Sequence, residues 1–204
     1  MISIYAIKPA FQRLLSPLLS GLQAAGITPN QITCAALFIS VVQGAALYLW
    51  PDARWVLALY APVLLIRMAL DALDGMLARR MRLESRLGAL LNELGDVLAD
   101  IALYLPFIWV AGIHPALALG VVLLALVAEF TGVLAQAITG TRAHQGPMGK
   151  SDRAFAYAVL ALMCAAGVSP GLRNGLLAVI ALLLVWTLFN RCRASLKHDA
   201  PQTP

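Results

Sequence analysis

Six apolar stretches of roughly 20 residues recur along this chain, and they constrain its fold more than any other feature. They run approximately over 31–50, 54–78, 89–111, 115–138, 154–168 and 173–190. An α-helix of about 20 apolar residues is long enough to cross the ~30 Å hydrocarbon core of a bilayer. Because 61% of the 204 residues are hydrophobic and only 12% are charged, the chain has too few polar groups to solvate a globule of its size. The sequence therefore predicts an all-α, polytopic membrane protein with six transmembrane helices.

The segment before the first apolar stretch, residues 1–26, has a different pattern. Apolar residues recur there at helical spacing: Phe11, Leu14, Leu15, Leu18, Leu19 and Leu22. Lys8 and Arg13 can stay near anionic headgroups, so we expect an amphipathic helix that lies on the membrane surface. The segment is mixed rather than a basic start followed by an apolar run, so no cleavable signal peptide is expected; a partly ordered leader is the alternative. We expect one membrane domain over 1–194 and a disordered tail over 195–204.

Lysine and arginine residues predict the orientation of the chain. If the amino terminus is cytoplasmic, twelve of the 15 basic residues lie on the cytoplasmic side, Arg54 and Arg173 lie outside, and Arg67 is within the second span. The positive-inside rule then predicts that both termini and the charged connections 79–88 and 139–153 face the cytoplasm. The net charge of +5 indicates a membrane surface and anionic substrates. Nucleic acid is not an expected partner, because no aromatic-basic module is visible.

Acidic residues gather where the second predicted span ends and the third begins, in the segments 71–79 and 88–100. Three- and four-residue steps place side chains on one face of a helix. The resulting faces carry Asp71, Asp74, Gly75 and Ala78 in the first segment, and Gly88, Asn92, Asp96 and Asp100 in the second. Because the connection between them is short, the two helices are antiparallel neighbours. We therefore expect the two faces to meet.

Several carboxylates at membrane depth are costly unless they are paired or bound to cations, and such residues are functional by default. Oxygen ligands without histidine or cysteine favour Mg²⁺ or Mn²⁺. A divalent ion held by carboxylates commonly also holds phosphate oxygens, so a pyrophosphate-containing substrate is expected. The small residues on the same faces, Gly75, Ala78 and Gly88, would leave room for it.

The order D-x2-D-G-x2-A-R-x8-G-x3-N-x3-D resembles the signature of the CDP-alcohol phosphotransferases, also called CDP-alcohol phosphatidyltransferases. Seven of the eight signature positions match, and the family pattern ends in two aspartates where this chain has Asn92 and then Asp96. The segment 28–33 and the six-span layout are also similar to that family, so the resemblance covers nearly the whole chain. Within the family, the segments 92–96 and 146–153 most resemble the small YnbA-type bacterial members.

The resemblance implies a transferase of phospholipid biosynthesis in the bacterial inner membrane. Such an enzyme moves a phosphatidyl group from CDP-diacylglycerol, or a related group from another CDP-alcohol, to a polar alcohol or alcohol phosphate, and releases CMP. The resemblance also implies a homodimer, for which we expect small residues such as Gly112, Gly120 and Gly132 at helix contacts.

Each signature position acquires a role from the resemblance. Asp71, Asp74, Asn92 and Asp96 would hold one or two Mg²⁺ or Mn²⁺ ions. Asp96 would also take the proton of the acceptor hydroxyl, and Asp71 and Asp74 would act with it in catalysis. The pocket for the CDP donor would be lined by Asn30, Gly75, Ala78, Arg79 and Gly88.

The departure at Asn92 leaves other functions open. A neutral amide in place of a carboxylate removes one negative charge from the expected metal site, so a catalytically weak partner subunit that binds the CDP-lipid is one alternative. A cation-coupled transporter is another, although no internal repeat is visible and the carboxylates lie near one membrane surface.

The connection 139–153 also clusters cations, with glycines near them. Arg142, Lys150 and Arg153 form a possible site for an acceptor phosphate, whereas simple positive-inside anchoring is the alternative. The sequence does not distinguish glycerol 3-phosphate, inositol phosphate, serine or another alcohol, and the basic residues favour a phosphorylated acceptor. Glu129 and Arg67, both within spans, are expected to pair with each other or to line a cavity.

Overall fold

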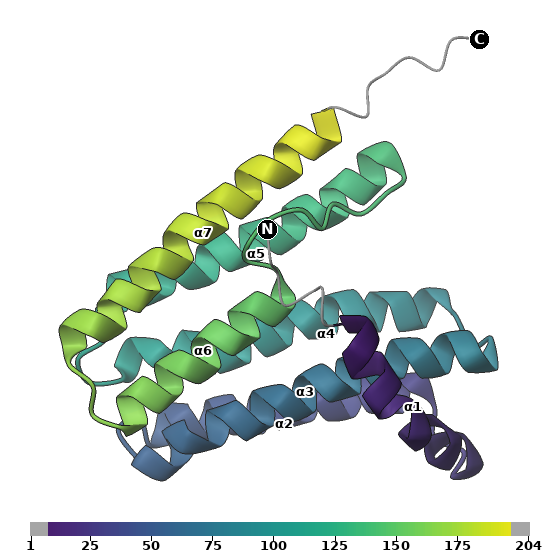
Figure 1. Ribbon diagram of the computed structural model, residues 1–204, viewed down its shortest axis with the longest axis horizontal. Helices are drawn as coiled ribbons and strands as arrows, with labels where there is room; N and C mark the ends of the chain where they lie inside the picture. Colours follow the sequence, from purple (N-terminus) through teal and green to yellow (C-terminus); the bar gives the residue numbers. More distant parts are fainter. Residues whose placement is uncertain (1–7, 197–204) are drawn as a thin grey trace.

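The computed structural model describes residues 8–196, and all of the regular structure among them is helical (Figure 1). The helices are α1 (Lys8–Ala24), α2 (Pro29–Leu49), α3 (Arg54–Met81), α4 (Arg86–Tyr104), the short 3-10 helix η2 (Leu105–Trp109), α5 (Pro115–Thr139), α6 (Lys150–Ala165) and α7 (Pro170–Leu196). The all-α prediction is therefore confirmed for the described residues.

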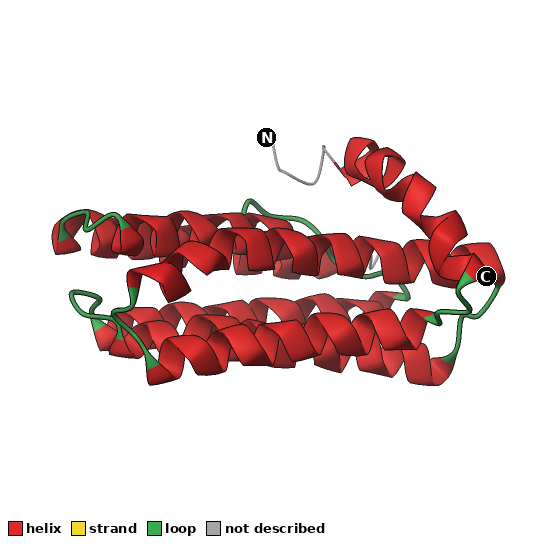
Figure 2. Ribbon diagram, turned by 90° about the horizontal axis from the view of Figure 1, so that it is seen from below, coloured by secondary structure: helices red, strands yellow, loops and turns green. Residues whose placement is uncertain are grey.

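The helices from α2 to α7 form an elongated bundle, and Figure 2 shows them in two layers with α1 set at an angle across one end. Helix α2 packs on α3 and α4, α3 packs on α6, and α5 packs on α7. Helices that are far apart in the sequence are thus neighbours, and the start of α6 lies beside Asp71 of α3.

Side-chain caps fix where two of these helices begin. At α2, the Thr28 hydroxyl accepts a hydrogen bond from the Gln31 amide at 3.3 Å, and the Gln31 side chain accepts one from the Thr28 amide at 2.9 Å. This reciprocal pair satisfies two backbone donors that have no partner within the helix. At α4, the Ser85 hydroxyl accepts from the Gly88 amide at 3.0 Å. The two caps hold the signature residue Gly88 at the start of α4, beside the start of α2.

Two apolar clusters hold the bundle together. The larger one fills the space between α2–α7 and contains a group of buried aromatic rings. Tyr104 stacks on Tyr157 with ring centroids 3.9 Å apart, and Phe107 meets Tyr60 edge-on at 5.1 Å. The smaller cluster joins α1 to α2 and α3, and its buried members are Leu15, Leu19, Ile32, Leu73 and Leu77.

Helix α1 has the amphipathic pattern that the sequence predicted. Leu15 and Leu19 are buried against the bundle, whereas Leu14 and Leu18 are exposed on the outer side. The first part of the expected interfacial helix, residues 1–7, lies outside the described residues. So does most of the expected tail; its first two residues, Ser195 and Leu196, belong to α7 instead.

Four helices of the described chain, α2, α3, α5 and α7, are long and apolar enough to cross a membrane. The protein is thus a multi-pass membrane protein by length and hydropathy. The third and fifth expected spans correspond to α4 with η2 and to α6. Helix α4 carries three carboxylates, and α6 has only 16 residues, so neither meets the same standard by itself. The count of six spans therefore stays a prediction.

Helices α2 and α4 approach each other very closely at Gly44. A Cβ atom on Gly44 would lie 1.9 Å from the carbonyl oxygen of Ala102 and 2.7 Å from its carbonyl carbon. Both atoms belong to helix backbone, which cannot rotate away as a side chain can. The two helices can pack in this way only because position 44 has no side chain.

We predict that Gly44→Ala destabilises the protein by about 1–3 kcal/mol, because α2 and α4 must separate to admit the methyl group. Thermal unfolding of the purified protein in detergent would measure the loss. Gly175→Ala is the matched control, since Gly175 also lies within a helix and a Cβ atom there meets nothing within 4 Å. Equal stability of the two variants would contradict this close approach of the helices.

Candidate functional site

The two signature faces on α3 and α4 meet, as the sequence predicted. Asp74 on α3 is buried, and its Oδ2 accepts a hydrogen bond from the Thr33 hydroxyl of α2 at 2.7 Å. The side-chain amide of Asn92 on α4 donates to the same oxygen at 3.5 Å. Three helices therefore converge at Asp74, and the residue that departs from the family signature faces a signature carboxylate.

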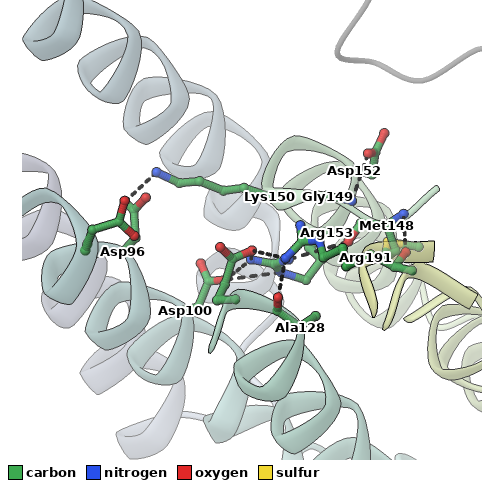
Figure 3. A network of polar contacts seen from close by, with 12 residues as sticks. Asp96, Asp100, Ala128, Met148, Gly149, Lys150, Asp152, Arg153 and Arg191 are labelled. Atoms are coloured by element: carbon green, nitrogen blue, oxygen red, sulfur yellow. Dashed lines mark hydrogen bonds and ion pairs between the residues drawn. The ribbon is translucent and has the colours of Figure 1, made fainter. Parts of the chain in front are cut away.

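A lysine ammonium lies between the other two signature carboxylates. Lys150 Nζ is 2.5 Å from Oδ1 of Asp96 on α4, and it also forms an ion pair with Oδ2 of Asp71 on α3. Figure 3 shows the extended Lys150 side chain reaching Asp96. Lys150 is the first residue of α6, so the start of this helix provides a cation for the carboxylate pair.

The path of the α5–α6 connection explains how Lys150 reaches this position. Figure 1 shows the connection running back from the end of α5 toward the middle of the bundle. Gly146, with φ of 135°, lets the connection pass so close to Thr187 of α7 that a Cβ atom would lie 2.5 Å from its methyl group. The Met148 amide then donates to the Thr187 hydroxyl at 3.0 Å. The connection is thus fastened to α7 just before α6 begins.

Arg67 lies among the carboxylates of Asp71, Asp96 and Asp100 and is almost fully buried. Its Nη2 is 3.3 Å from Oδ1 of Asp100 and 3.6 Å from Oδ1 of Asp96, and its Nη1 is 4.0 Å from Oδ2 of Asp71. Of the two alternatives for Arg67 and Glu129, a pair between them is therefore wrong. The carboxylates of α3 and α4 surround Arg67, whereas Glu129 of α5 has arginine partners of its own.

Glu129 lies among three arginines from separate parts of the chain. Arg153 Nη2 on α6 is 2.9 Å from its Oε1, and Arg142 Nη2 in the α5–α6 connection is 2.9 Å from its Oε2. Arg191 Nη1 on α7 is 3.8 Å from Oε1 and also donates to the Ala128 carbonyl. Charge pairs with one carboxylate thus join α5 to α6, to α7 and to the connection.

Two further carboxylates complete this part of the site. Both Nε and Nη2 of Arg153 donate to Oδ2 of Asp100, at 3.2 and 2.8 Å, and Figure 3 shows the two side chains together. Arg142 also pairs with Glu93 of α4. The contacts run without a break from Asp96 through Arg67, Asp100 and Arg153 to Glu129, so the predicted cation site and the arginine cluster form one network.

Sequence reasoning gave Arg191 no place in the site. Its position one residue beyond the last predicted span indicated only a cytoplasmic anchor. In the structure it is 4% exposed and points at Glu129. The available signal was weak, because basic residues at the cytoplasmic end of a span are common.

The residues expected around the CDP donor lie near Asp74. The Asn30 side-chain oxygen is 3.1 Å from the point where a Cβ on Gly88 would be, so these two residues face each other. The Arg79 guanidinium lies 3.5 Å from the corresponding point on Gly75, which places it over the same face of α3. Ala78 is partly buried one turn beyond Asp74. The structure therefore brings the expected donor residues to one end of α2, α3 and α4.

Comparison of the sequence with known protein families identifies the family of this chain. Residues 26–188 match the model of the CDP-alcohol phosphatidyltransferases. The chain belongs to the CDP-alcohol phosphatidyltransferase family. The match extends from just before α2 into α7, so it includes every residue of the site except Arg191.

Among its relatives in this family, the chain is 45% identical to the inner membrane protein YnbA of Escherichia coli K12 over 200 residues, which are 97% of this chain and 98% of YnbA. This confirms the predicted similarity to the YnbA-type members. The chain is also 33% identical over 110 residues to a phosphatidylinositol phosphate synthase of Mycobacteroides abscessus, covering 50% of this chain and 44% of that protein.

Solved structures of the Mycobacterium tuberculosis phosphatidylinositol phosphate synthase PgsA1 share the fold. The structure with CDP-DAG bound has a TM-score of 0.76 at 21% identity, over 94% of this chain and 100% of that one. The complex with manganese and citrate has the same TM-score and identity, over 93% and 92%. The helical arrangement of this chain is thus that of PgsA1.

We predict that Asp100→Ala lowers the free energy of unfolding by about 3–5 kcal/mol, because it leaves the buried Arg67 and Arg153 without a shared partner. Denaturant unfolding in detergent measures this loss. Glu84→Ala is the control, since Glu84 is an exposed carboxylate in the α3–α4 connection. A similar small effect for both variants would contradict the structural role of Asp100.

Proposed function

We propose that the protein is a transferase that moves a phosphatidyl group from CDP-diacylglycerol to the hydroxyl of an acceptor alcohol and releases CMP. The observation that carries the proposal is the meeting of Asp71 from α3 and Asp96 from α4 at one cation, the Lys150 ammonium. Asp74 lies one helical turn from Asp71, and the Asn92 amide donates to it. Family membership supports the reaction class. The binding of CDP-DAG by PgsA1, which shares this fold, supports the donor.

The residues present fit a hard divalent ion, Mg²⁺ or Mn²⁺. No three Asp, Glu, His or Cys side chains among residues 8–196 are close enough to hold one ion as they stand. Yet the Lys150 ammonium already lies where Asp71 and Asp96 can share a positive charge, and all the donors are oxygens. We infer that Asp71, Asp74, Asp96 and the side-chain oxygen of Asn92 hold one or two such ions once Lys150 withdraws. PgsA1 has been solved with manganese, which supports this choice of metal.

The proposed mechanism assigns a task to each group of residues. The CDP group binds along Asn30, Gly88 and the face of α3 that carries Gly75 and Ala78. Arg79, which lies over that face, contacts its phosphates. Asp96 takes the proton of the acceptor hydroxyl. The acceptor oxygen forms a bond to the phosphorus that carries the diacylglycerol, and the bond from that phosphorus to CMP breaks. The bound metal supplies charge neutralisation for the pyrophosphate and for the departing CMP.

The proposal includes an orientation and an assembly. We propose six spans, with the site and both termini facing the cytoplasmic side of an inner membrane, as the distribution of basic residues favours. We also propose a homodimer. Two of the glycines expected at its contacts serve internal packing instead: Gly132 faces Arg191, and Gly112 adopts a φ of 78° in a turn against Pro170.

A second function is favoured by one contact. The Asn92 amide donates to Asp74, so it uses a carboxylate oxygen that an ion would otherwise bind. A CDP-lipid-binding subunit with little turnover is therefore the second candidate. Incubation of the purified protein with CDP-diacylglycerol, Mg²⁺ or Mn²⁺ and a panel of alcohols, with CMP and lipid products measured by mass spectrometry, separates the two functions. Binding of the donor without CMP release would favour the second.

We predict opposite outcomes for two exchanges one turn apart on α4. Asp96→Asn should lower the rate of CMP release by ~10²–10⁴-fold, because it removes a ligand charge and the proposed base together. Asn92→Asp restores the family signature, so it should keep activity and lower the metal concentration required. Mg²⁺ and Mn²⁺ titrations of CMP release measure both. Wild-type turnover in Asp96→Asn would exclude the proposed catalytic role of Asp96.

We predict that Lys150→Met strengthens Mn²⁺ binding several-fold, because the ammonium that competes for Asp71 and Asp96 is removed. Electron paramagnetic resonance of free Mn²⁺ measures the affinity without any need for turnover. Arg54→Met is the control for loss of one positive charge, since Arg54 is exposed at the start of α3. Unchanged or weaker binding in Lys150→Met would contradict a shared cation position.

A further inference from the structure

The arginine cluster around Glu129 has the composition of an anion site, but a carboxylate already lies at its centre. Arg142, Arg153 and Arg191 converge from the α5–α6 connection, α6 and α7. Guanidinium groups that converge in this way are well suited to bind phosphate through paired hydrogen bonds. Here each of them faces Glu129 instead, and Glu129 is 9% exposed.

Charge in the cluster is already balanced by the chain itself. Three arginines face three carboxylates, namely Glu93, Asp100 and Glu129. Arg67 and Lys150 pair with Asp71 and Asp96, and Asp74 accepts hydrogen bonds from Thr33 and Asn92. The whole network thus contains five cations and six carboxylates. No positive charge is left over for a dianionic phosphate. A phosphate placed here would be held close to Glu129 and repelled by it.

The hydrogen-bond acceptors of the cluster also favour a hydroxyl group over a phosphate. Oε1 of Glu129 and Oδ1 of Asp100 are buried and accept no hydrogen bond from the described residues, although both belong to ion-paired carboxylates. Arg153 Nη2 lies 2.9 Å from Glu129 Oε1 and Arg67 Nη2 lies 3.3 Å from Asp100 Oδ1, so each oxygen is held by a charge pair and can accept a further hydrogen bond. A hydroxyl group can donate to them, whereas an ionised phosphate offers only further acceptors.

The cluster is also close enough to the proposed reaction to contact an acceptor. Arg153 is one helical turn after Lys150 on α6, and Lys150 reaches Asp96. Arg67 joins Asp96 to Asp100, which Arg153 holds. The polar groups of an alcohol whose reacting hydroxyl is at Asp96 can therefore reach Glu129 and its arginines.

We propose that Glu129 is a specificity-determining residue that excludes phosphate from the acceptor pocket, so that the acceptor is an alcohol without a phosphate group. This inference rests on the proposed transferase function. It reverses the expectation from sequence that Arg142, Lys150 and Arg153 favour a phosphorylated acceptor. The same three cations are present, but each is committed to a carboxylate of the chain.

Phosphate binding tests the proposal independently of turnover. Isothermal titration of the purified, detergent-solubilised protein with inorganic phosphate and with glycerol 3-phosphate should give no saturable binding to the wild type. Glu129→Gln should bind both saturably, with a Kd at least tenfold below the highest concentration tested on the wild type, because it removes the central charge and keeps an oxygen acceptor. Glu84→Gln, an exchange of an exposed carboxylate, should behave as the wild type. Saturable phosphate binding by the wild type that is lost in Arg191→Gln would overturn the proposal.

Turnover tests the same proposal with matched acceptors. CMP release from CDP-diacylglycerol should be faster with glycerol than with glycerol 3-phosphate, and with inositol than with inositol 1-phosphate, by at least tenfold in kcat/KM. Glu129→Gln should lower the ratio of kcat/KM between the unphosphorylated and the phosphorylated acceptor, or invert it. A wild-type preference for the phosphorylated member of either pair would overturn the proposal.

Failure of the transferase function is distinguishable from failure of this inference. If no acceptor yields CMP while the phosphate titrations behave as expected, the proposed reaction is wrong and the exclusion of phosphate by Glu129 stands. If Glu129→Gln does not fold, Glu93→Gln replaces it, because that side chain is more exposed and, among residues 8–196, forms an ion pair with Arg142 alone. Glu93→Gln should raise the affinity for phosphate by less than Glu129→Gln. An unchanged affinity in Glu93→Gln would count against the proposal.

Discussion

Burial of ionised side chains between helices is the constraint on which the rest of this structure depends. Each buried charge loses its hydration, and this cost is offset only by partners in good geometry. Asp71, Asp96 and Asp100 share Arg67, while Glu129 is shared by three arginines. Because the partners come from α3, α4, α5, α6 and α7, the network fixes how these helices lie relative to one another.

The network also explains the unusual course of the α5–α6 connection. A charged segment at the membrane surface would ordinarily stay in water, yet this one returns into the bundle and is bonded to Thr187. Its cations Arg142, Lys150 and Arg153 each find carboxylates there. In the function proposed above, the same contacts have a consequence, because Lys150 must move before Asp71 and Asp96 can share a divalent ion.

Membership of the family bears on the donor and the metal, whereas the details of the site bear on the acceptor. The shared fold and signature support a CDP-linked donor and a metal held by carboxylates, and those features gather at Asp74 and the starts of α2 and α4. The proposed acceptor side lies at the arginine cluster instead. There the buried carboxylate Glu129 is paired with three arginines, so a family match does not define the acceptor.

The sequence by itself determined the helical class, the family and the meeting of the α3 and α4 faces, because apolar length and three- and four-residue spacing are local properties. It also identified Asp71, Asp74 and Asp96 as a group. Only the tertiary structure decided the partners of Arg67 and Glu129, and it brought Arg191 into the site. Ion pairs between helices far apart in the sequence depend on helix packing and on the path of a connection, and neither leaves a periodic pattern in the chain.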